Sequence, residues 1–332
     1  MNILIVKMSS LGDVIQTIPV VQDLRQQFPD AHIDWMVEEA FAPLVDRVQG
    51  VRRVLPLAQR RWRKSRWNEA TRRERKHFDQ HLKQQSYDAV IDFQGLIKSA
   101  LEARCAKLSP NGFSATYGNR SDACGYEWPV QLLLQRKLPM PERIHAVARY
   151  RLLAGLAMGY EPQGQAVYPL SQSLLKEEST VVFAHGTTRA DNEWQEANWV
   201  ALGQRLIDSG KRIALPHANA TELALVHRIA QALGDKVEIW PRGNLSEVMD
   251  RMAATGGVIG VDSGLSHMAV SLNLPHVQIF SQPRAWRAGP IGCSHQVAVG
   301  GEAAPEVHTV WNAWQSVHHL AGGTCTARPE AI

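Results

Sequence analysis

Residues 257–272 read GVIGVDSGLSHMAVSL, an apolar run that turns at small residues and continues into a second apolar segment with helical spacing. This stretch predicts a β-strand, a tight turn and an α-helix in that order. The same order occurs at residues 2–28, NILIVKMSSLGDVIQTIPVVQDLRQQF. Repeated strand–turn–helix units are typical of α/β proteins with parallel sheets, because parallel neighbours need a crossover connection.

The rest of the first half continues this alternation of short apolar runs and longer amphipathic segments. We expect strands at Asn2–Val6, His32–Val37, Val51–Leu55 and Ala89–Phe93. We expect helices at Gly12–Phe28, Glu39–Gln49, Trp67–Gln85, Leu96–Ala106 and Arg143–Met158.

A second alternating series follows residues 161–178, whose Gly, Pro, Gln and Ser content predicts a linker. Its expected strands are Thr180–Ala184, Arg212–Leu215, Val237–Trp240, Gly257–Val261 and His276–Phe280. Its expected helices are Glu196–Ser209, Thr221–Ala232, Leu245–Ala254 and Leu265–Leu272, with a further helix near the C-terminus. The sequence therefore predicts an α/β protein of two doubly wound, Rossmann-like domains, residues 1–160 and 179–332, that face each other across a cleft. Open sheets of this kind bind ligands at the carboxyl ends of their strands.

The composition excludes several classes of protein. A chain of 332 residues with 45% hydrophobic and 20% charged residues is neither disordered nor of low complexity, and its length suits about two domains. The four cysteines, Cys105, Cys124, Cys293 and Cys325, contain no C-x-x-C pair, so we expect neither a disulfide framework nor a zinc site. No export signal or membrane-spanning run is recognisable, and we expect a cytoplasmic protein whose membrane contact is peripheral.

Basic residues are concentrated between Val51 and His77, although the net charge of the whole chain is only +4. Residues 60–67, RRWRKSRW, interleave cations with tryptophans. This pattern fits a nucleic acid, through phosphate pairing and base stacking, or an anionic lipid surface with the indoles at the headgroup level. A solvated charged face is the third interpretation. Because no other stretch adds a comparable basic stripe, we favour the lipid and expect no nucleic-acid partner.

The loop after the first strand, residues 7–13 (KMSSLGD), lacks the G-x-G-x-x-G spacing of dinucleotide-binding proteins. Ser9 or Ser10 can cap the helix that follows, and Gly12 permits a close approach. Asp13 then lies in the first helical turn, where the helix dipole favours its ionised form. Asp13 either only complements this dipole or acts as a general base that accepts a proton from an attacking hydroxyl.

The turn at residues 262–267, DSGLSH, is a candidate anion site. Backbone N–H groups of Ser263, Gly264 and Leu265 at the helix start lack intrahelical partners and, with the dipole, favour a diphosphate. The alternative is an ordinary helix capped by Asp262 or Ser263. His267 is either a core histidine or part of the site.

A similar loop, HGTTRADNEW, follows the first strand of the second half at residues 185–194. Thr187, Thr188 and Arg189 each offer a donor for a phosphoryl oxygen. Glu222, after the next strand, either supplies a negative charge to a helix N-terminus or accepts hydrogen bonds from ribose hydroxyls.

Seven segments resemble, in order and spacing, the lipopolysaccharide heptosyltransferase I family: LIVKMSSLGDVIQTIP (4–19), WMVEEAF (35–41), RRWRK (60–64), YDAVIDFQGLIKSA (87–100), HAVARY (145–150), HGTTRADNEW (185–194) and GVDSGLSHMA (260–269). The related heptosyltransferase II enzymes share the SSLGD start and the D-[ST]-G-x-x-H turn, so the RRWRK block favours the first family.

The resemblance implies an inverting glycosyltransferase of GT-B architecture that needs no metal or other cofactor. It would transfer L-glycero-D-manno-heptose from ADP-heptose to the first Kdo of Kdo2-lipid A at the cytoplasmic face of the inner membrane, in synthesis of the lipopolysaccharide inner core. Asp13 would be the base. The residues that would bind the donor are Asp262 (heptose), Ser263, Gly264 and Leu265 (diphosphate), Thr187, Thr188, Arg189, Asn192 and His267 beside them, and Glu222 (ribose). The residues that would bind the acceptor are Ser10, Gly12, Arg60, Arg61, Arg63, Lys64 and Arg120.

Three places depart from the pattern. His217-Ala218 replaces a more usual Trp-Gly, and residues 281–284 (SQPR) replace a typical Gly-Pro-Thr run. Asn192 stands where the family usually carries a lysine that neutralises the departing diphosphate. An uncharged amide cannot replace a full cation. Either Arg189 compensates or turnover is slower. Two alternatives therefore stay open beside the resemblance: an ADP-heptose transferase with another acceptor, as in heptosyltransferase II, and a non-catalytic module that binds nucleotides or polyanions.

Overall fold

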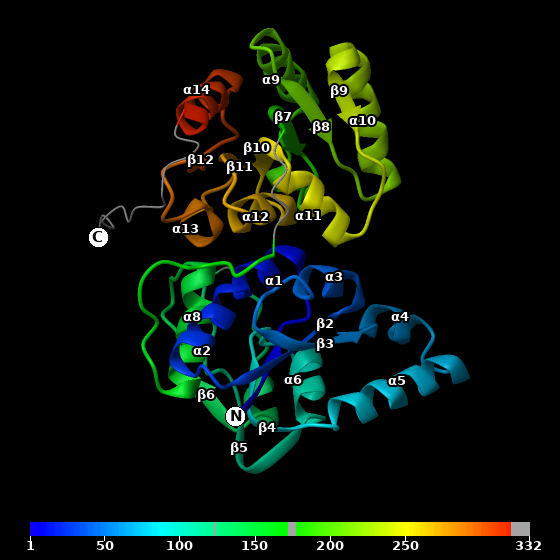
Figure 1. The fold of residues 1–332 in the computed structure, drawn as a ribbon, viewed down its shortest axis with the longest axis vertical. Helices are drawn as coiled ribbons and strands as arrows, with labels where there is room; N and C mark the ends of the chain where they lie inside the picture. The colour runs from blue at the N-terminus through cyan, green and yellow to red at the C-terminus, as the bar shows by residue number, and fades with distance from the viewer. Residues whose placement is uncertain (123, 172–176, 320–332) are drawn as a thin grey trace. The chain divides into compact units, whose positions relative to one another are not determined.

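The computed structural model describes residues 1–122, 124–171 and 177–319. The chain divides into two compact units, Met1–Ser171 and Gln172–Ile332, hereafter unit 1 and unit 2. Each unit contains one six-stranded sheet in which neighbouring strands pair in parallel, with helices packed on it (Figure 1). The predicted α/β class with two doubly wound sheets is confirmed.

Unit 1 has the strand order β3-β2-β1-β4-β5-β6. Its strands are β1 (Asn2–Val6), β2 (His32–Glu38), β3 (Val51–Leu57), β4 (Ser86–Asp92), β5 (Lys107–Tyr117) and β6 (Arg136–Leu138). Its helices are α1 (Leu11–Thr17), α2 (Pro19–Gln27), α3 (Ala42–Val45), α4 (Gln59–Lys64), α5 (Glu69–Leu82), α6 (Ile97–Arg104), α7 (Val130–Leu133) and α8 (Ala146–Met158), with a 3₁₀ turn at Glu39–Phe41.

Two expectations for unit 1 are wrong, and two of its strands were not expected. The helix predicted at 12–28 is interrupted at Ile18, because Pro19 has no N–H to continue the helical hydrogen bonds and starts α2 instead. The helix predicted at 39–49 is reduced to the 3₁₀ turn and α3. Strands β5 and β6 were not predicted, since β5 contains a proline and an asparagine and β6 has only three residues.

Helix α8 packs on both α1 and α2 (Figure 1). Arg151 on α8 forms a buried ion pair with Asp23 on α2, with Nε 2.7 Å from Oδ2 and Nη2 2.9 Å from Oδ1. Its guanidinium also donates to the carbonyls of Gln163 and Gly164. A buried ion pair needs such additional hydrogen bonds to offset its desolvation. These bonds fix α2 against the last helix of the unit.

Unit 2 has the strand order β12-β11-β10-β7-β8-β9. Its strands are β7 (Glu177–Ala184), β8 (Arg212–Leu215), β9 (Val237–Ile239), β10 (Thr255–Val261), β11 (His276–Phe280) and β12 (Gln296–Gly300). Its helices are α9 (Glu196–Asp208), α10 (Ala220–Leu233), α11 (Leu245–Ala253), α12 (Gly264–Ser271), α13 (Ala285–Ala288) and α14 (Val307–His319), with 3₁₀ turns at Ala190–Asn192 and Gly234–Lys236.

The five predicted strands and four predicted helices of unit 2 are present, as is the helix near the C-terminus, while β12 and α13 were not predicted. Strand β7 begins at Glu177, inside the predicted linker 161–178, of which residues 172–176 lie outside the described residues. Numbered from the first strand of each unit, both sheets have the order 3-2-1-4-5-6. The order reverses between β1 and β4 and between β7 and β10, and such reversal points are where doubly wound sheets bind ligands.

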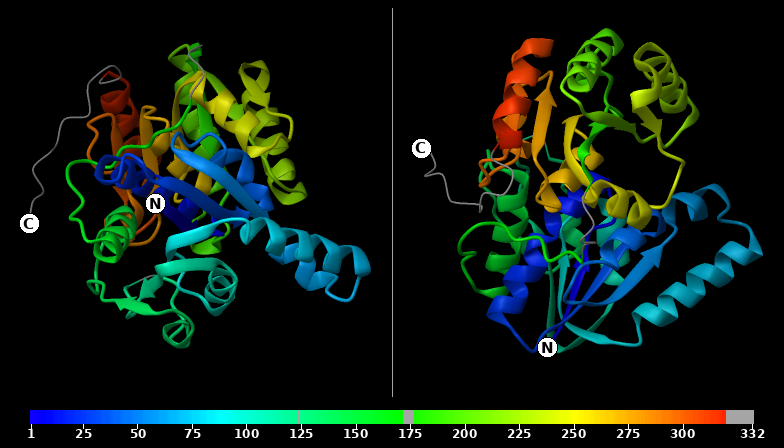
Figure 2. Two further views of the ribbon diagram at one scale, coloured as in Figure 1. Left: turned by 60° about the horizontal axis from the view of Figure 1, so that its bottom comes forward. Right: turned by 45° about the horizontal axis from the view of Figure 1, so that its top comes forward.

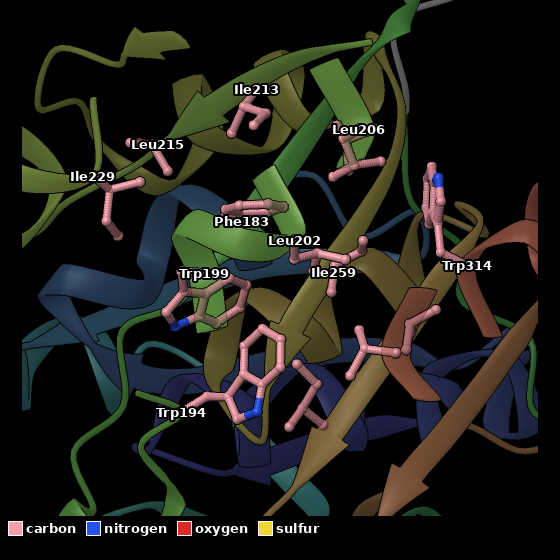
Figure 3. Close-up of a cluster of buried hydrophobic side chains, with 14 of the residues drawn as sticks. Phe183, Trp194, Trp199, Leu202, Leu206, Ile213, Leu215, Ile229, Ile259 and Trp314 are labelled. Carbon is pink, nitrogen blue, oxygen red and sulfur yellow. The ribbon is translucent and has the colours of Figure 1, made fainter. Parts of the chain in front are cut away.

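An aromatic cluster anchors the sheet of unit 2 (Figure 3). The rings of Phe183 and Trp199 lie 4.8 Å apart between centroids, and those of Trp194 and Trp199 lie 4.9 Å apart in a T-shaped pair. The Trp194 indole also donates to the carbonyl of Pro305. Since Trp194 follows β7 by only ten residues, it fixes the far end of the loop that leaves this strand.

Three of the four cysteines lie in the described residues. Cys105 and Cys124 are free cysteines. Cys293 is disulfide-bonded, a single bond that the spacing of the cysteines did not predict, and Cys325 lies outside the described residues. Among residues 1–122, 124–171 and 177–319, no helix is both long enough and apolar enough to cross a bilayer.

Candidate active site

Asp13 lies in the first turn of α1, at the carboxyl end of β1, as predicted. Ser10 caps this helix, and its backbone N–H and hydroxyl both donate to Asp13 Oδ2, at 3.1 and 2.9 Å. The Tyr150 hydroxyl donates to Oδ1 at 2.8 Å. The carboxylate is a quarter exposed. The Asp13 carboxylate is therefore fixed by hydrogen bonds, partly accessible to solvent, and located where the strand order of the sheet reverses.

Two residues that the sequence did not single out, Lys7 and Tyr150, complete the surroundings of Asp13. Lys7 is buried, and its Nζ lies 4.0 Å from Asp13 Oδ1 and 4.8 Å from the centre of the Tyr150 ring. It also donates to the carbonyl of Phe93. Burial lowers the pKa of Lys7 to about 8, although the nearby Asp13 charge raises it. At pH 7 the ammonium is still mostly protonated and complements the carboxylate.

Burial, followed by the charge of Asp13, raises the pKa of Tyr150 well above its ordinary value. The phenol therefore keeps its proton and stays a hydrogen-bond donor to Asp13. Arg149, which is also buried, donates to the Tyr150 oxygen at 3.4 Å and stacks over the rings of Tyr117 and Tyr150. Arg149 thus holds the Tyr150 hydroxyl, which in turn orients the Asp13 carboxylate.

The basic segment forms α4 and the beginning of α5, an arm that extends from the β3 edge of unit 1 (Figure 2). Arg60, Arg61, Arg63 and Lys64 are exposed, but Arg61 binds Glu39 and Glu74 at 3.0 and 2.7 Å. These two carboxylates raise the pKa of Arg61. The charge of Arg61 is thus already neutralised by carboxylates of unit 1.

The tryptophans of the arm differ in position. Trp62 is buried, packs edge-on against Phe78 at 5.8 Å and donates to Glu74 at 2.8 Å. The expectation that both indoles lie at a headgroup level is therefore wrong for Trp62, because its N–H already has a carboxylate partner inside the unit. Trp67 is 74% exposed, with the guanidinium groups of Arg66 and Arg72 over its ring.

The remaining acceptor-side candidates of unit 1 lie near the carboxyl ends of its strands. Gly12 is in α1 beside Asp13, and Arg120 is exposed in the loop after β5. Strands β3 and β5 are each two positions from β1 in the sheet, about 10 Å away at the usual spacing. Ser10, Gly12 and Asp13 therefore share one turn, whereas the α4 cations and Arg120 flank it on either side.

In unit 2, Asp262 follows β10 directly and lies at the reversal point between β10 and β7. Gly260 pairs with Ala184, and a Cβ at 260 would lie 2.5 Å from the Ala184 Cβ and 2.5 Å from Ser266 Oγ. Only glycine lets the two strand ends and the start of α12 approach this closely. Ser263 caps α12 by accepting from the Ser266 N–H at 3.4 Å, so the predicted cap is present.

Polar side chains surround the Asp262 carboxylate. Gln278 Nε2 donates to Oδ1 at 3.2 Å, Asn192 Nδ2 donates to Oδ2 at 3.5 Å, and His267 Nε2 lies 3.4 Å from Oδ1. Burial raises the pKa of Asp262, but the His267 hydrogen bond and the charges of His267, Arg287 and Arg284 outweigh it, so the net effect is a lowered pKa. Asp262 is therefore an ionised carboxylate at the strand end.

The loop after β7 lies against this carboxylate. Thr187 Oγ1 donates to the Asp262 carbonyl at 3.5 Å, whereas Thr188 is exposed. Arg189 is exposed and forms a two-bond ion pair with Asp191, one bond being Nε to Oδ1 at 2.9 Å. Asn192 is buried. The structure thus brings together Thr187, Asn192, Asp262 and His267, with Ser263, Gly264 and Leu265 in the adjoining turn.

Glu222 lies in the first turn of α10, after β8, where its carboxylate accepts from the Ala218 N–H at 2.7 Å and the Asn219 side chain at 2.8 Å. Its carboxylate would be 3.1 Å from a Cβ at Gly186, which begins the loop after β7. This position fits the interpretation of Glu222 as a negative charge at a helix start, and its role as an acceptor of hydrogen bonds from ribose hydroxyls stays a prediction.

In the described part of the chain, no group of three or more His, Cys, Asp or Glu side chains could hold a metal ion. The residues that sequence reasoning missed are Lys7 and Tyr150 around Asp13, and Gln278, Arg284 and Arg287 near Asp262. Lys7 adjoins the SSLGD loop and Tyr150 ends the segment HAVARY, so position beside these motifs was the available signal.

Both sheets have the topology of nucleotide-binding domains. Unit 1 carries the hydrogen-bonded Asp13 carboxylate, and unit 2 carries Asp262 and His267 at the start of α12. These features fit the class of glycosyltransferases that are built from two such sheets. Comparison with known proteins agrees. The family model of glycosyltransferase family 9 (heptosyltransferase) matches residues 75–312. Lipopolysaccharide heptosyltransferase 1 of Escherichia coli K12 is 37% identical over 90% of this chain and 93% of its own, and that of Pseudomonas aeruginosa PAO1 is 35% identical over 91% and 84%.

Among solved structures, the E. coli heptosyltransferase WaaC with ADP matches with a TM-score of 0.83 and 34% identity, over 96% of this chain and 99% of that one. The structure of E. coli ADP-heptose heptosyltransferase II matches with a TM-score of 0.76 at 22% identity and shows the fold alone. The chain belongs to glycosyltransferase family 9, the heptosyltransferase family, and is an enzyme of the heptosyltransferase 1 type.

Proposed function

We propose that the chain transfers L-glycero-D-manno-heptose from ADP-heptose to the first Kdo of Kdo2-lipid A, with inversion at the anomeric carbon. The observation that carries this proposal is the Asp13 carboxylate, which is accessible and held by Ser10 and Tyr150 at the reversal point of the first sheet. Similarity to heptosyltransferase 1 enzymes and to WaaC with ADP supports the choice of substrates.

In the proposed reaction, Asp13 accepts the proton of the attacking Kdo hydroxyl as the new bond from its oxygen to the heptose anomeric carbon forms. The bond from that carbon to the ADP oxygen breaks, and its electron pair remains on the diphosphate. Lys7 complements the negative charge of the Asp13 carboxylate from 4.0 Å away, and Tyr150 and Ser10 orient the carboxylate. No metal or other cofactor takes part in this proposal.

Unit 2 holds the donor in this proposal. Asp262 and His267 bind heptose hydroxyls, and the N–H groups of Ser263, Gly264 and Leu265 bind the diphosphate at the start of α12. Thr187 and Thr188 assist there, and Asn192 orients Asp262. Glu222 binds the ribose. The residues proposed to bind acceptor carboxylates and phosphates in unit 1 are Arg60, Arg61, Arg63, Lys64 and Arg120, with Ser10 and Gly12 beside the reacting hydroxyl.

The test is release of ADP by the purified chain supplied with ADP-heptose and Kdo2-lipid A. We expect Asp13→Ala to lower kcat by about 10²- to 10⁴-fold while the Kd for ADP stays the same. Asp30→Ala, at an exposed aspartate before β2, is the matched control and should keep full activity. Transfer only to an already heptosylated acceptor would identify a heptosyltransferase II-like enzyme. An equal loss of binding and rate in Asp13→Ala would favour a binding module.

We also propose that the enzyme works in the cytoplasm as a peripheral protein of the inner membrane. The exposed cations Arg63 and Lys64 and the exposed Trp67 support contact with anionic headgroups, which attract basic segments by about 1 kcal/mol per cation. The double variant Arg63→Glu and Lys64→Glu should sediment less with anionic vesicles, while Arg242→Glu in unit 2 should not differ from the wild type. Equal sedimentation of all three proteins would make the arm a solvated face.

A further inference from the structure

Two arginines, Arg284 and Arg287, follow β11, the strand beside β10. Arg284 precedes the short helix α13 and Arg287 lies within it. Residues three apart in a helical turn lie on the same face, and both side chains are half-buried. Neither residue was a candidate from the sequence, although both lie in the segment that follows a carboxyl strand end.

Hydrogen bonds connect this segment to the turn at Asp262. The Asp262 N–H donates to the Ile279 carbonyl of β11 at 3.2 Å. The Ser281 hydroxyl donates to the Glu193 carbonyl, at the end of the loop after β7, at 3.5 Å. The loops after β7, β10 and β11 therefore meet on one side of the sheet, and α12 and α13 follow the last two of these strands (Figure 1).

The charges of the two arginines reach the acidic groups of these loops. Both contribute to lowering the pKa of Asp262, Arg287 more than Arg284. Arg284 also contributes to lowering the pKa of Asp191, although the main cause there is the hydrogen bond from Arg189. The two guanidinium groups therefore act on the same carboxylate that Asn192 and His267 contact.

Within the described ranges, neither guanidinium has an ion pair, and Arg287 Nε is buried without a hydrogen-bond partner. Two other arginines of unit 2 do form ion pairs: Arg189 is bound by Asp191, and Arg228 is bound by Glu196 at 2.8 Å. A buried donor without a partner is costly and is rarely retained unless a ligand or water satisfies it. Among the described residues, the two arginines are thus a cationic pair that acts on Asp262 from a distance and forms no direct ion pair.

This inference rests on the proposed function, because that function places a diphosphate at the start of α12. When the sugar–oxygen bond breaks, the leaving β-phosphate gains one negative charge. Preorganised cations stabilise such developing charge more than they stabilise the bound substrate. We propose that Arg284 and Arg287 bind the β-phosphate of the donor and neutralise the charge that develops on it as ADP departs.

The neighbouring alternatives are less suited to this role. Asn192 is neutral and buried, and its amide donates to Asp262. Arg189 is already neutralised by Asp191 and must give up that ion pair before it can serve a phosphate. Arg284 and Arg287 need no such exchange, and the planar guanidinium group can bind a phosphate through two hydrogen bonds at once.

The test compares ADP with AMP, since only ADP carries the β-phosphate. Arg284→Gln, Arg287→Gln and the double variant are titrated calorimetrically with each nucleotide, and kcat and KM for ADP-heptose are measured. A charge-assisted hydrogen bond of about 1.5–3 kcal/mol corresponds to about ten- to hundredfold in affinity. We expect the double variant to bind ADP about ten- to hundredfold more weakly and to bind AMP with an affinity within about threefold of the wild type. Its kcat should fall by a larger factor than its KM for ADP-heptose rises.

Arg228→Gln is the control, because it removes an exposed, ion-paired arginine of the same unit. Thermal melting checks that each variant is folded, and Arg287→Lys should restore part of the ADP affinity lost in Arg287→Gln. Equal losses of affinity for ADP and for AMP, or unchanged ADP affinity in a folded double variant, would overturn this inference but leave the proposed function intact. A wild-type chain that binds no ADP would refute the proposed function and this inference with it.

Discussion

Replacement of Lys7 by methionine should stabilise the protein at neutral pH, although Lys7 lies beside the candidate base. The buried ammonium has its pKa lowered from 10.5 to about 8. At about 1.4 kcal/mol per pKa unit, this difference corresponds to about 3 kcal/mol. Burial of the charged form therefore destabilises the folded state by about this amount relative to a lysine with its ordinary pKa.

The sign of the pH dependence follows from proton counts. Between pH 8 and pH 10.5 the unfolded chain holds the Lys7 proton more often than the folded protein does, so the free energy of unfolding of the wild type rises with pH in this window. Below pH 8 the penalty is fully present, and above pH 10.5 it is absent. The Lys7→Met variant lacks this titration, so its advantage should shrink by about 3 kcal/mol from pH 7 to pH 10.5.

Urea unfolding of both proteins at several values between pH 7 and pH 10.5 measures this change. Loss of the Nζ hydrogen bond to the Phe93 carbonyl costs about 1 kcal/mol at all pH values and does not alter the slope. Lys137→Met, at an exposed lysine of β6, is the control and should show no such change. A stability difference between Lys7→Met and wild type that is constant across this range would refute the reasoning.

Three further predictions concern packing and charge. Gly260→Ala should lower the free energy of unfolding by about 1–3 kcal/mol and weaken ADP binding, because the added Cβ would overlap atoms of β7 and α12. Gly125→Ala is the control: its Cβ would meet only the Leu96 side chain, at 3.6 Å, so calorimetric melting should show almost no change in stability. Asp262→Asn should lower the free energy of unfolding at pH 7, because a carboxylate whose pKa is lowered in the folded state stabilises the fold when it is ionised. This difference in free energy between the variant and the wild type should disappear as the pH falls below the ordinary aspartate pKa of 3.8 and Asp262 becomes protonated. A difference that persists at low pH in acid-unfolding curves would contradict this prediction. Trp62→Phe should cost about 1.5–3 kcal/mol in urea unfolding by removing the indole donor to Glu74, and a neutral result would mean that this bond is dispensable.

The sequence predicted best those elements whose apolar runs are short, buried and bounded by turn residues. Strands β8 (Arg212–Leu215) and β11 (His276–Phe280) have the predicted bounds. Strand β5 could not be predicted from local pattern, because Pro110 and Asn111 interrupt its apolar residues and its extended form depends on pairing with β4. Pairing between distant segments leaves no periodic signal in either one.

The candidate sites divide in the same way. Asp13 and Asp262 were predictable because a turn between a strand and a helix fixes their positions locally. Tyr150 was not, since it is 137 residues from Asp13 in the sequence. The alternation of cations and tryptophans also did not predict that Trp62 is buried and bonded to a carboxylate. Its partners Phe78 and Glu74 lie on α5, so the burial of Trp62 depends on the packing of α5 beside α4.

The contacts of α8 impose an order on biosynthesis. Asp13 and α2 leave the ribosome more than a hundred residues before the hydroxyl of Tyr150 that binds Asp13 and the guanidinium of Arg151 that fixes α2. In a nascent chain that ends before α8, Asp13 therefore has its hydrogen bonds from Ser10 but lacks the one from Tyr150. A recombinant fragment of the first unit must likewise extend at least through residue 171, where the backbone N–H still bonds to Arg47.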